Sequence, residues 1–252
     1  MLLQINNLSF KYKDNLKPTL NNVNIELQEN ETVALLGVSG SGKSTLFNVL
    51  TELYSPTSGE INFNNCELID LSYIRQSAMD MLFPWKTVQE NIEFALKERN
   101  ISIQNNKERI NNLLKVLKLE KHKNVYPKKL SGGEKKRLSF ACGLSYLPKI
   151  ILLDEAFTGI DLTLKLELWS FLKSEIKKTK ASSFIITHDF DEAIYLADRL
   201  IFLNPNGTLC DDIITIDKKL KNSEQDIEVF LSQNKIVEIK KRALNIFRKI
   251  SE

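Results

Sequence analysis

The chain has 252 residues, of which 42% are hydrophobic and 27% are charged. This proportion of apolar residues excludes a disordered protein, and the length is sufficient for one folded domain with a large core. The 35 basic and 32 acidic residues give a formal net charge of +3, which is too small to indicate nucleic-acid binding. No apolar run reaches the length of a membrane span, and we expect no secretion signal and reduced cysteine thiols.

Alternation of apolar and polar residues near the start of the chain predicts a strand with one exposed face. Val23, Ile25 and Leu27 are apolar, and polar residues separate them. We therefore expect a small antiparallel sheet within residues 1–30. Further along, short and mainly apolar segments are typical of buried parallel strands. These segments are 32–36, 150–153, 183–187 and 200–203.

Helical patterns separate these strands. Over 161–178, apolar residues recur at steps of three and four, which predicts an amphipathic helix packed on a sheet. Its apolar stripe consists of Leu162, Leu166, Trp169, Leu172 and Ile176. The pattern over about 87–147 indicates a helical insertion, which ends with a helix at 131–146. Gly143 is expected to weaken that helix by about 1 kcal/mol relative to alanine.

The C-terminal part combines a short strand, expected around 213–216, with a charged amphipathic region at 224–249. Basic residues recur in this region: Lys240, Lys241, Arg242 and Arg248. Two interpretations stay open. The region forms a helix that packs on the core with a basic outer face, or its basic face contacts anionic lipid.

The first glycine-rich loop, residues 37–45, fits the pattern G-x-x-x-x-G-K-[ST] between a buried strand and an apolar helix. A phosphate chain needs several backbone N–H groups aimed at one point, which a compact glycine loop before a helix provides. Lys43 is expected to reach the β- and γ-phosphates, and the Ser44 hydroxyl to bind Mg²⁺. The predicted nucleotide-binding residues here are Gly37, Val38, Ser39, Gly40, Ser41, Gly42, Lys43, Ser44 and Thr45.

Two acidic residues follow the apolar segment 150–153 and complete the predicted catalytic site. Asp154 suits the magnesium site, directly or through water, and Glu155 suits a residue that polarises the attacking water. The alternative is a strand that ends in solvated carboxylates. The phosphate-binding loop upstream favours the catalytic interpretation.

A second glycine-rich loop identifies a family. Residues 130–137 read LSGGEKKR, open a helix and begin 24 residues before Asp154. Together with the phosphate-binding loop, this segment resembles the ATP-binding subunits of ABC transporters over residues 1–205. The resemblance implies an α/β fold: a P-loop NTPase core with a mainly parallel sheet, an N-terminal antiparallel subdomain and an inserted helical subdomain. It also implies that Ser131, Gly132 and Gly133 bind ATP held by a second subunit.

The same resemblance assigns further roles. Tyr12 corresponds to the aromatic residue that stacks on adenine, and Gln76 to the glutamine that contacts Mg²⁺ and the attacking water. Asp161 corresponds to an aspartate at the dimer interface, and it also suits the N-cap of the helix that follows. His188 corresponds to the switch histidine that senses the γ-phosphate. The expected catalytic residues are Glu155, His188, Gln76 and Lys43, and the expected metal ligands are Ser44, Gln76 and Asp154.

Local features resemble one branch of the family. Residues 83–85 (FPW) and 187–193 (THDFDEA) resemble importers of nitrate, sulfonate, taurine and pyrimidine precursors. Glu134 and Ala156 depart from the usual pattern. Apolar residues near Gln76 suit docking to a permease, although each could instead pack internally. They are Met79, Met81, Leu82, Phe83 and Trp85.

The resemblance therefore implies one ABC-type ATP-binding domain over 1–252, with a helical insertion at about 87–147 and a strand and helix extension at about 206–252. Its expected activity is Mg²⁺-dependent ATP hydrolysis that drives import of a small solute. The expected partners are a second copy of the chain, transmembrane permease subunits and, indirectly, an extracytoplasmic solute-binding protein. The expected location is the cytoplasmic face of the cell membrane. The alternatives are an exporter ATPase subunit and a soluble ATPase of DNA repair or translation.

Overall fold

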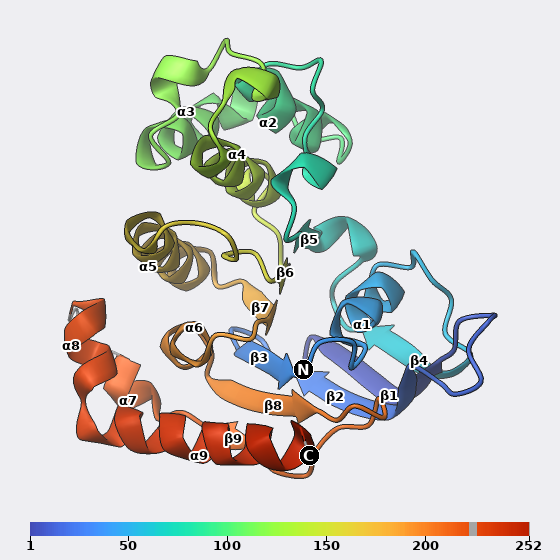
Figure 1. Ribbon diagram of the computed structural model, residues 1–252. Helices are drawn as coiled ribbons and strands as arrows, with labels where there is room; N and C mark the ends of the chain where they lie inside the picture. The colour runs from blue at the N-terminus through green and yellow to red at the C-terminus, as the bar shows by residue number, and fades with distance from the viewer. Residues whose placement is uncertain (222–225, 252) are drawn as a thin grey trace.

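The computed structural model describes residues 1–221 and 226–251 (Figure 1). Glu224, from which the charged C-terminal region was expected to extend, and the last residue of the expected domain lie outside the described residues. Within the described ranges, no helix combines the length and hydropathy needed to cross a bilayer.

The N-terminal part of the chain forms the antiparallel sheet that the alternation predicts. It has three strands in the order β2-β1-β4: β1 is Leu3–Phe10, β2 is Leu20–Leu27 and β4 is Ser58–Phe63. In β2 the apolar residues are buried and the polar residues between them are exposed. β4 was not expected, because most of its residues are polar or exposed and give no apolar pattern.

The main sheet has six strands in the order β5-β6-β7-β3-β8-β9, all parallel except β9. The strands are β3 Thr32–Gly37, β5 Leu71–Ile74, β6 Ile150–Asp154, β7 Ser182–Ile186, β8 Arg199–Leu203 and β9 Ile214–Thr215. The four predicted buried strands are thus confirmed as β3, β6, β7 and β8. Every residue of β3, β6 and β7 is buried, as expected for strands covered on both faces.

Helices surround the main sheet (Figure 1). Their bounds are α1 Lys43–Leu50, α2 Val88–Lys97, α3 Lys107–Val116, α4 Gly132–Leu144, α5 Leu162–Thr179, α6 Phe190–Leu196, α7 Lys218–Lys221, α8 Ile227–Ser232 and α9 Asn234–Ser251. Figure 1 places α2, α3 and α4 in a helical lobe at the top, beyond β5 and β6. α9 runs along the lower edge, and α1 lies beside the N-terminal sheet. The fold confirms the expected P-loop NTPase class.

Two hydrophobic cores lie on opposite faces of the main sheet. On β3, Ala34 and Leu36 belong to the core that includes the helical lobe, whereas Val33 and Leu35 belong to the core shared with α1 and the N-terminal sheet. This alternation follows from the period of two in a strand. Phe47 of α1 packs edge-on against Phe184 of β7, with ring centroids 5.2 Å apart. The helix after the glycine loop is therefore anchored between two sheets.

The apolar stripe of α5 differs from the expected one. Leu162 is 66% exposed, because it lies at the first position of the helix, outside the packed face. Trp169 and Leu172 of the expected stripe are buried, Leu166 and Ile176 are partly buried against the core, and Leu164 and Leu168 are buried in addition.

The structure adds a packing reason for Gly143 to its expected cost to the helix. A Cβ atom added at Gly143 would lie 2.7 Å from Ser72 Oγ and 2.9 Å from Ile74 Cγ1 of β5. The glycine lets α4 approach the edge strand of the main sheet closely. Alanine would improve helix propensity but would collide with β5, so the glycine is required by packing.

Candidate functional site

The loop between β3 and α1 has the conformation that its glycines permit. Gly40 and Gly42 have φ angles of +80° and +103°, in the left-handed region that side chains rarely adopt. A Cβ atom at Gly42 would also lie 2.8 Å from the carbonyl oxygen of Thr19. The loop therefore wraps tightly around the N-terminus of α1, where free backbone N–H groups favour an anion.

Lys43 lies at the start of α1 with its side chain buried. Its Nζ donates hydrogen bonds of 2.8 Å to the carbonyl oxygens of Gly37 and Val38, within the same loop. Burial lowers the pKa of Lys43, and the nearby Glu155 and Asp154 carboxylates oppose this shift. The lysine is thus a desolvated cation held at the mouth of the loop.

Ser41 provides a direct test of whether the loop fits a phosphate. Its Oγ is buried, and it has no hydrogen-bond partner within the described part of the chain. A buried hydroxyl without a partner is costly, and a phosphate oxygen would satisfy it. The loop residues therefore fit a bound phosphate chain.

Ser44 and Asp154 form the second part of the site. The Ser44 hydroxyl donates to Asp154 Oδ1 at 3.1 Å, and the Tyr73 hydroxyl donates to Asp154 Oδ2 at 3.0 Å. Burial raises the pKa of Asp154, and the two hydroxyl donors oppose this shift. Hydroxyl and carboxylate oxygens are ligands that Mg²⁺ prefers, so the donor set fits the expected metal.

Sequence reasoning did not identify Tyr73. It lies in β5, which pairs in parallel with β6 and so brings the tyrosine beside Asp154. Burial raises the pKa of Tyr73, and the Asp154 carboxylate adds to the shift. The tyrosine is therefore a neutral donor to the carboxylate at neutral pH. A four-residue edge strand gives too little periodicity to reveal this pairing.

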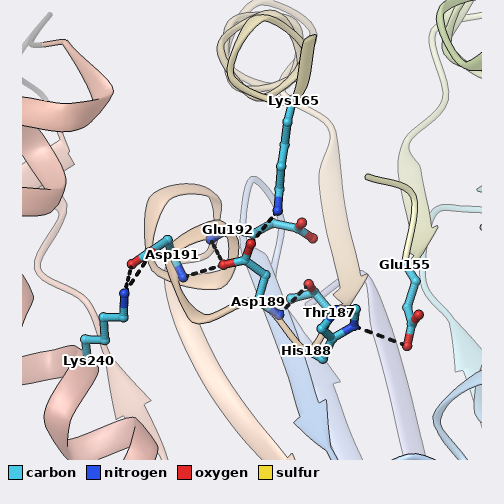
Figure 2. A network of polar contacts seen from close by, with 8 residues as sticks. All are labelled: Glu155, Lys165, Thr187, His188, Asp189, Asp191, Glu192 and Lys240. Atoms are coloured by element: carbon cyan, nitrogen blue, oxygen red, sulfur yellow. Dashed lines mark hydrogen bonds and ion pairs between the residues drawn. The ribbon is translucent and has the colours of Figure 1, made fainter. Parts of the chain in front are cut away.

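Glu155 and His188 are brought together because they follow adjacent parallel strands, β6 and β7. His188 Nδ1 lies 3.7 Å from Glu155 Oε1, and Figure 2 shows the two side chains facing each other. The φ angle of Glu155 is +44°, which is strained for a residue with a side chain. Such strain often accompanies functional sites, and here it directs the carboxylate toward the exposed histidine.

The residues after His188 form a tightly bonded turn (Figure 2). Asp189 caps α6 by accepting hydrogen bonds from the backbone N–H groups of Asp191 and Glu192, at 2.9 and 3.2 Å. Its other carboxylate oxygen forms an ion pair with Lys165 of α5. Burial alone would raise the pKa of Asp189, but the Lys165 bond and the capping N–H groups lower it below its ordinary value.

Gln76 lies after β5 with an exposed side chain. Its backbone carbonyl accepts a 2.6 Å hydrogen bond from Lys136 Nζ, which also donates to the carbonyl of Arg75 at 3.3 Å. Lys136 is only 3% exposed, and burial lowers its pKa to about 8 against the attraction of Glu192. This lysine of α4, which sequence reasoning did not single out, ties the glutamine segment to the helix that begins at the second glycine loop.

Tyr12 lies beside the first glycine loop. Its ring packs edge-on against Phe10, with centroids 4.8 Å apart, and against Tyr54 at 5.6 Å. Its hydroxyl lies 3.1 Å from Thr45 Oγ1. The structure thus places an aromatic cluster next to the loop, and the contact of Tyr12 with adenine stays a prediction.

The second glycine loop begins α4 through a capping box. Ser131 Oγ accepts from the N–H of Glu134 at 3.2 Å, and the Glu134 carboxylate accepts from the N–H of Ser131 at 2.7 Å. Glu134, which departs from the usual family pattern, therefore stabilises the loop. Gly132 has open space around it, whereas a Cβ atom at Gly133 would meet Leu164 at 2.8 Å.

Asp161 caps α5 by accepting a 3.0 Å hydrogen bond from the N–H of Leu164, which confirms its expected capping role. A cavity of about 310 Å³ lies between the Asp161 segment, Gln76 and the two glycines of the second loop. The second glycine loop and Asp161 thus border a shared hollow on the helical lobe. The first glycine loop leads into α1, whose apolar residues belong to the core on the other face of the main sheet.

The fold and this arrangement of loops define a P-loop ATPase. A model of the ABC transporter family matches residues 20–158. A probable sulfate/thiosulfate import ATP-binding protein, CysA of Chlorella vulgaris, is 39% identical over 197 residues, covering 75% of this chain and 82% of that protein. The nitrate import ATP-binding protein NrtD of Synechocystis is 36% identical over 193 residues, covering 75% of this chain and 73% of that protein.

Solved structures agree with the sequence comparisons. The dimeric ATP-binding cassette MJ0796, in a post-hydrolysis state bound to ADP and Pi, matches with a TM-score of 0.76 at 28% identity. The match covers 86% of this chain and 99% of the cassette. The chain belongs to the ABC transporter family, and it carries the ATP-binding ATPase domain of that family.

Proposed function

We propose that this chain is the ATP-hydrolysing subunit of an ABC importer for a small solute of the nitrate, sulfonate, taurine or pyrimidine-precursor type. The observation that carries the proposal is the convergence of three groups at one edge of the main sheet. These groups are the loop with Lys43, the Ser44–Asp154 hydrogen bond and the Glu155–His188 pair. The import proteins among its relatives support the direction of transport.

In this proposal the loop 37–45 binds the phosphates of ATP. Lys43 Nζ gives up its hydrogen bonds to the carbonyl oxygens of Gly37 and Val38 and contacts the β- and γ-phosphates. Ser44, Asp154 and Gln76 hold Mg²⁺. When bound, the ion neutralises phosphate charge during phosphoryl transfer. Tyr12 supplies the surface for adenine beside the loop.

Glu155 is the residue that orients and polarises the attacking water, and His188 contacts the γ-phosphate. Their separation of 3.7 Å lets both address one small region of space. A second copy of the chain completes each site with Ser131, Gly132, Gly133 and Asp161, of which the two glycines and Asp161 line the hollow beside Gln76. The functional unit is therefore a homodimer with two shared ATP sites.

The permease docks in a cavity of about 320 Å³ between β5, α2 and α4. Phe83, Phe94 and Tyr146 line it, and Arg99 lies over the Tyr146 ring at 3.5 Å. Aromatic walls with a charged rim suit a short amphipathic helix. The apolar residues expected to dock divide into three groups: Met79 and Trp85 are exposed, Met81 and Phe83 are partly buried, and Leu82 is buried.

Leu82 is therefore excluded from the docking surface, because it packs in the core of the helical lobe. Trp85 is 69% exposed and is the main candidate for contact with the permease. This docking places the subunit at the cytoplasmic face of the membrane. An extracytoplasmic solute-binding protein would deliver the solute to the permease.

The test is a pull-down of tagged Glu155→Gln protein from mild detergent with ATP and Mg²⁺, followed by mass spectrometry. A multi-span permease in stoichiometric amount is the expected result, and the Trp85→Ala variant should recover much less of it. Recovery of soluble or ribosomal partners alone would favour the non-transport ATPase. Stimulation of the complex by a solute-loaded binding protein distinguishes the importer from an exporter.

A further inference from the structure

The C-terminal helix α9 lies against α6, the helix that directly follows the candidate switch histidine (Figure 1). Ile236, Ala243 and Ile246 are the buried residues of α9 and belong to the larger hydrophobic core. On the same helix, Phe247 packs edge-on against Phe190, the first residue of α6, with ring centroids 5.6 Å apart. α9 is therefore a packed part of the fold with a specific contact to the start of α6.

A polar contact adds to this packing. Lys240 Nζ donates to both carboxylate oxygens of Asp191, at 2.6 and 2.7 Å. Lys240 and Phe247 are seven residues apart, so they lie two turns apart on one face of α9. Both contacts fall within the first two residues of α6. Figure 2 shows Lys240 approaching Asp191 from the side opposite to Lys165.

The first turn of α6 is thus held from two directions. Lys165 of α5 pairs with Asp189, the N-cap residue. Lys240 of α9 pairs with Asp191, two residues further along the chain. His188 immediately precedes the cap, and the N–H of Asp189 also donates to Thr187 at 3.0 Å. A shift of this turn would move His188 relative to Glu155.

We propose that Lys240 is a positioning residue for His188, through which the C-terminal helix sets the histidine against the γ-phosphate site. This inference rests on the role of His188 in the proposed function. It gives the basic C-terminal region a role in ATP hydrolysis. The neighbouring basic residue Lys241 is exposed.

The expected effect is on turnover and not on nucleotide affinity. The phosphate-binding loop and Tyr12 contact other elements, so their geometry does not depend on Lys240. The side chains of Lys240 and Asp191 are 39% and 36% exposed, and ion pairs this exposed add little to stability. A loss of activity without a loss of folding is therefore the signature of positioning.

The experiment compares Lys240→Met with Lys241→Met in the full chain, because the two substitutions remove the same charge from neighbouring positions of one helix. We expect Lys240→Met to lower kcat about three- to tenfold, with KM for ATP changed less than about twofold and the melting temperature equal to that of the control. Lys240→Arg should restore kcat, and Asp191→Asn should reproduce the loss. Equal kcat values for Lys240→Met and Lys241→Met would overturn the inference.

A second measurement separates this inference from the proposed function. His188→Ala should reduce turnover severely, and Lys240→Met should cause no further loss in that background. An additional loss of the same factor would show that Lys240 acts elsewhere and would overturn the inference. Full activity of His188→Ala would contradict the histidine role in the proposed function itself.

Discussion

Glu192 is the most deeply buried carboxylate near the switch segment. It is 3% exposed, and its Oε1 has no hydrogen-bond partner among the residues that the structure describes. Burial raises the pKa of Glu192 to about 8, a hydrogen bond with Thr187 opposes the shift, and the Asp189 carboxylate adds to it. Lys165 attracts the charged form and Glu155 repels it. The side chain is therefore largely a neutral acid at neutral pH.

This burial predicts a pH dependence of stability. A carboxyl group with a raised folded pKa contributes its full stability below the unfolded value near 4.5 and loses it as pH rises through about 8. Glu192→Gln resembles the neutral acid and has no proton to lose. We therefore expect its melting temperature to fall less steeply than that of the wild type between about pH 5 and 8, and the two curves to run parallel at higher pH.

Lys136 also has a shifted pKa and is attracted by the Glu192 carboxylate, so the comparison between the two proteins reports Glu192 together with this attraction. The pKa of Lys136 is lowered to about 8, so its contribution to stability is lost as pH falls through that value. Thermal unfolding followed by circular dichroism at each pH provides the measurement. Parallel curves for wild type and Glu192→Gln between about pH 5 and 8 would contradict the prediction.

At the level of single residues, sequence patterns identified the site residues that belong to motifs of adjacent residues. Lys43 and Asp154 belong to motifs of adjacent residues, and their contacts agree with those motifs. Tyr73 and Lys136 were not identified, because their partners lie 81 and 60 or more residues away in the chain. Contacts of this kind depend on strand pairing and helix packing, which a linear pattern does not contain.

At the scale of elements, the packing of α4 on β5 depends on Gly143. We expect Gly143→Ala to destabilise the protein by about 1–3 kcal/mol, because the added methyl group would collide with Ser72 and Ile74. Gly132→Ala is the matched control, since it adds the same atom to the same helix in open space. Urea unfolding of both variants provides the measurement. A Gly143→Ala variant as stable as the wild type would show that α4 can move away from β5 at no cost.

Other elements show which parts of the fold a sequence can predict. The strands β3, β6, β7 and β8 were predicted because each is buried on nearly all its residues and carries a continuous apolar signal. β4 and β5 were not, because one is mostly exposed and the other has four residues. The packed face of α5 was predicted correctly except in its first turn, where Leu162 is exposed and Leu164 is buried.

At the scale of the whole molecule, the positions of the two glycine loops bear on the proposed dimer. The first loop joins β3 to α1 beside the N-terminal sheet, and the second opens α4 in the helical lobe (Figure 1). The second loop also borders an open hollow with Gln76 and Asp161. MJ0796, to which this chain is similar, is dimeric. Closure of two copies on two ATP molecules would bring each first loop against the second loop of the partner.

This arrangement predicts a dimer that forms with ATP and persists only when hydrolysis is blocked. Glu155→Gln should bind ATP, double its molar mass on addition of Mg²⁺-ATP and hydrolyse very slowly, because the residue proposed to polarise water is lost. Static light scattering after gel filtration provides the measurement. Lys43→Ala in the same background should stay monomeric because it loses ATP binding.

Adding Ser131→Arg to Glu155→Gln separates the two halves of the composite site. The double variant should also stay monomeric, but each single chain should still bind ATP, because its phosphate-binding loop is intact. The pattern distinguishes a site shared between subunits from a site built within one chain. If Ser131→Arg dimerised normally, the second glycine loop would not contact the nucleotide of a partner, and the observed hollow beside Gln76 would need another occupant.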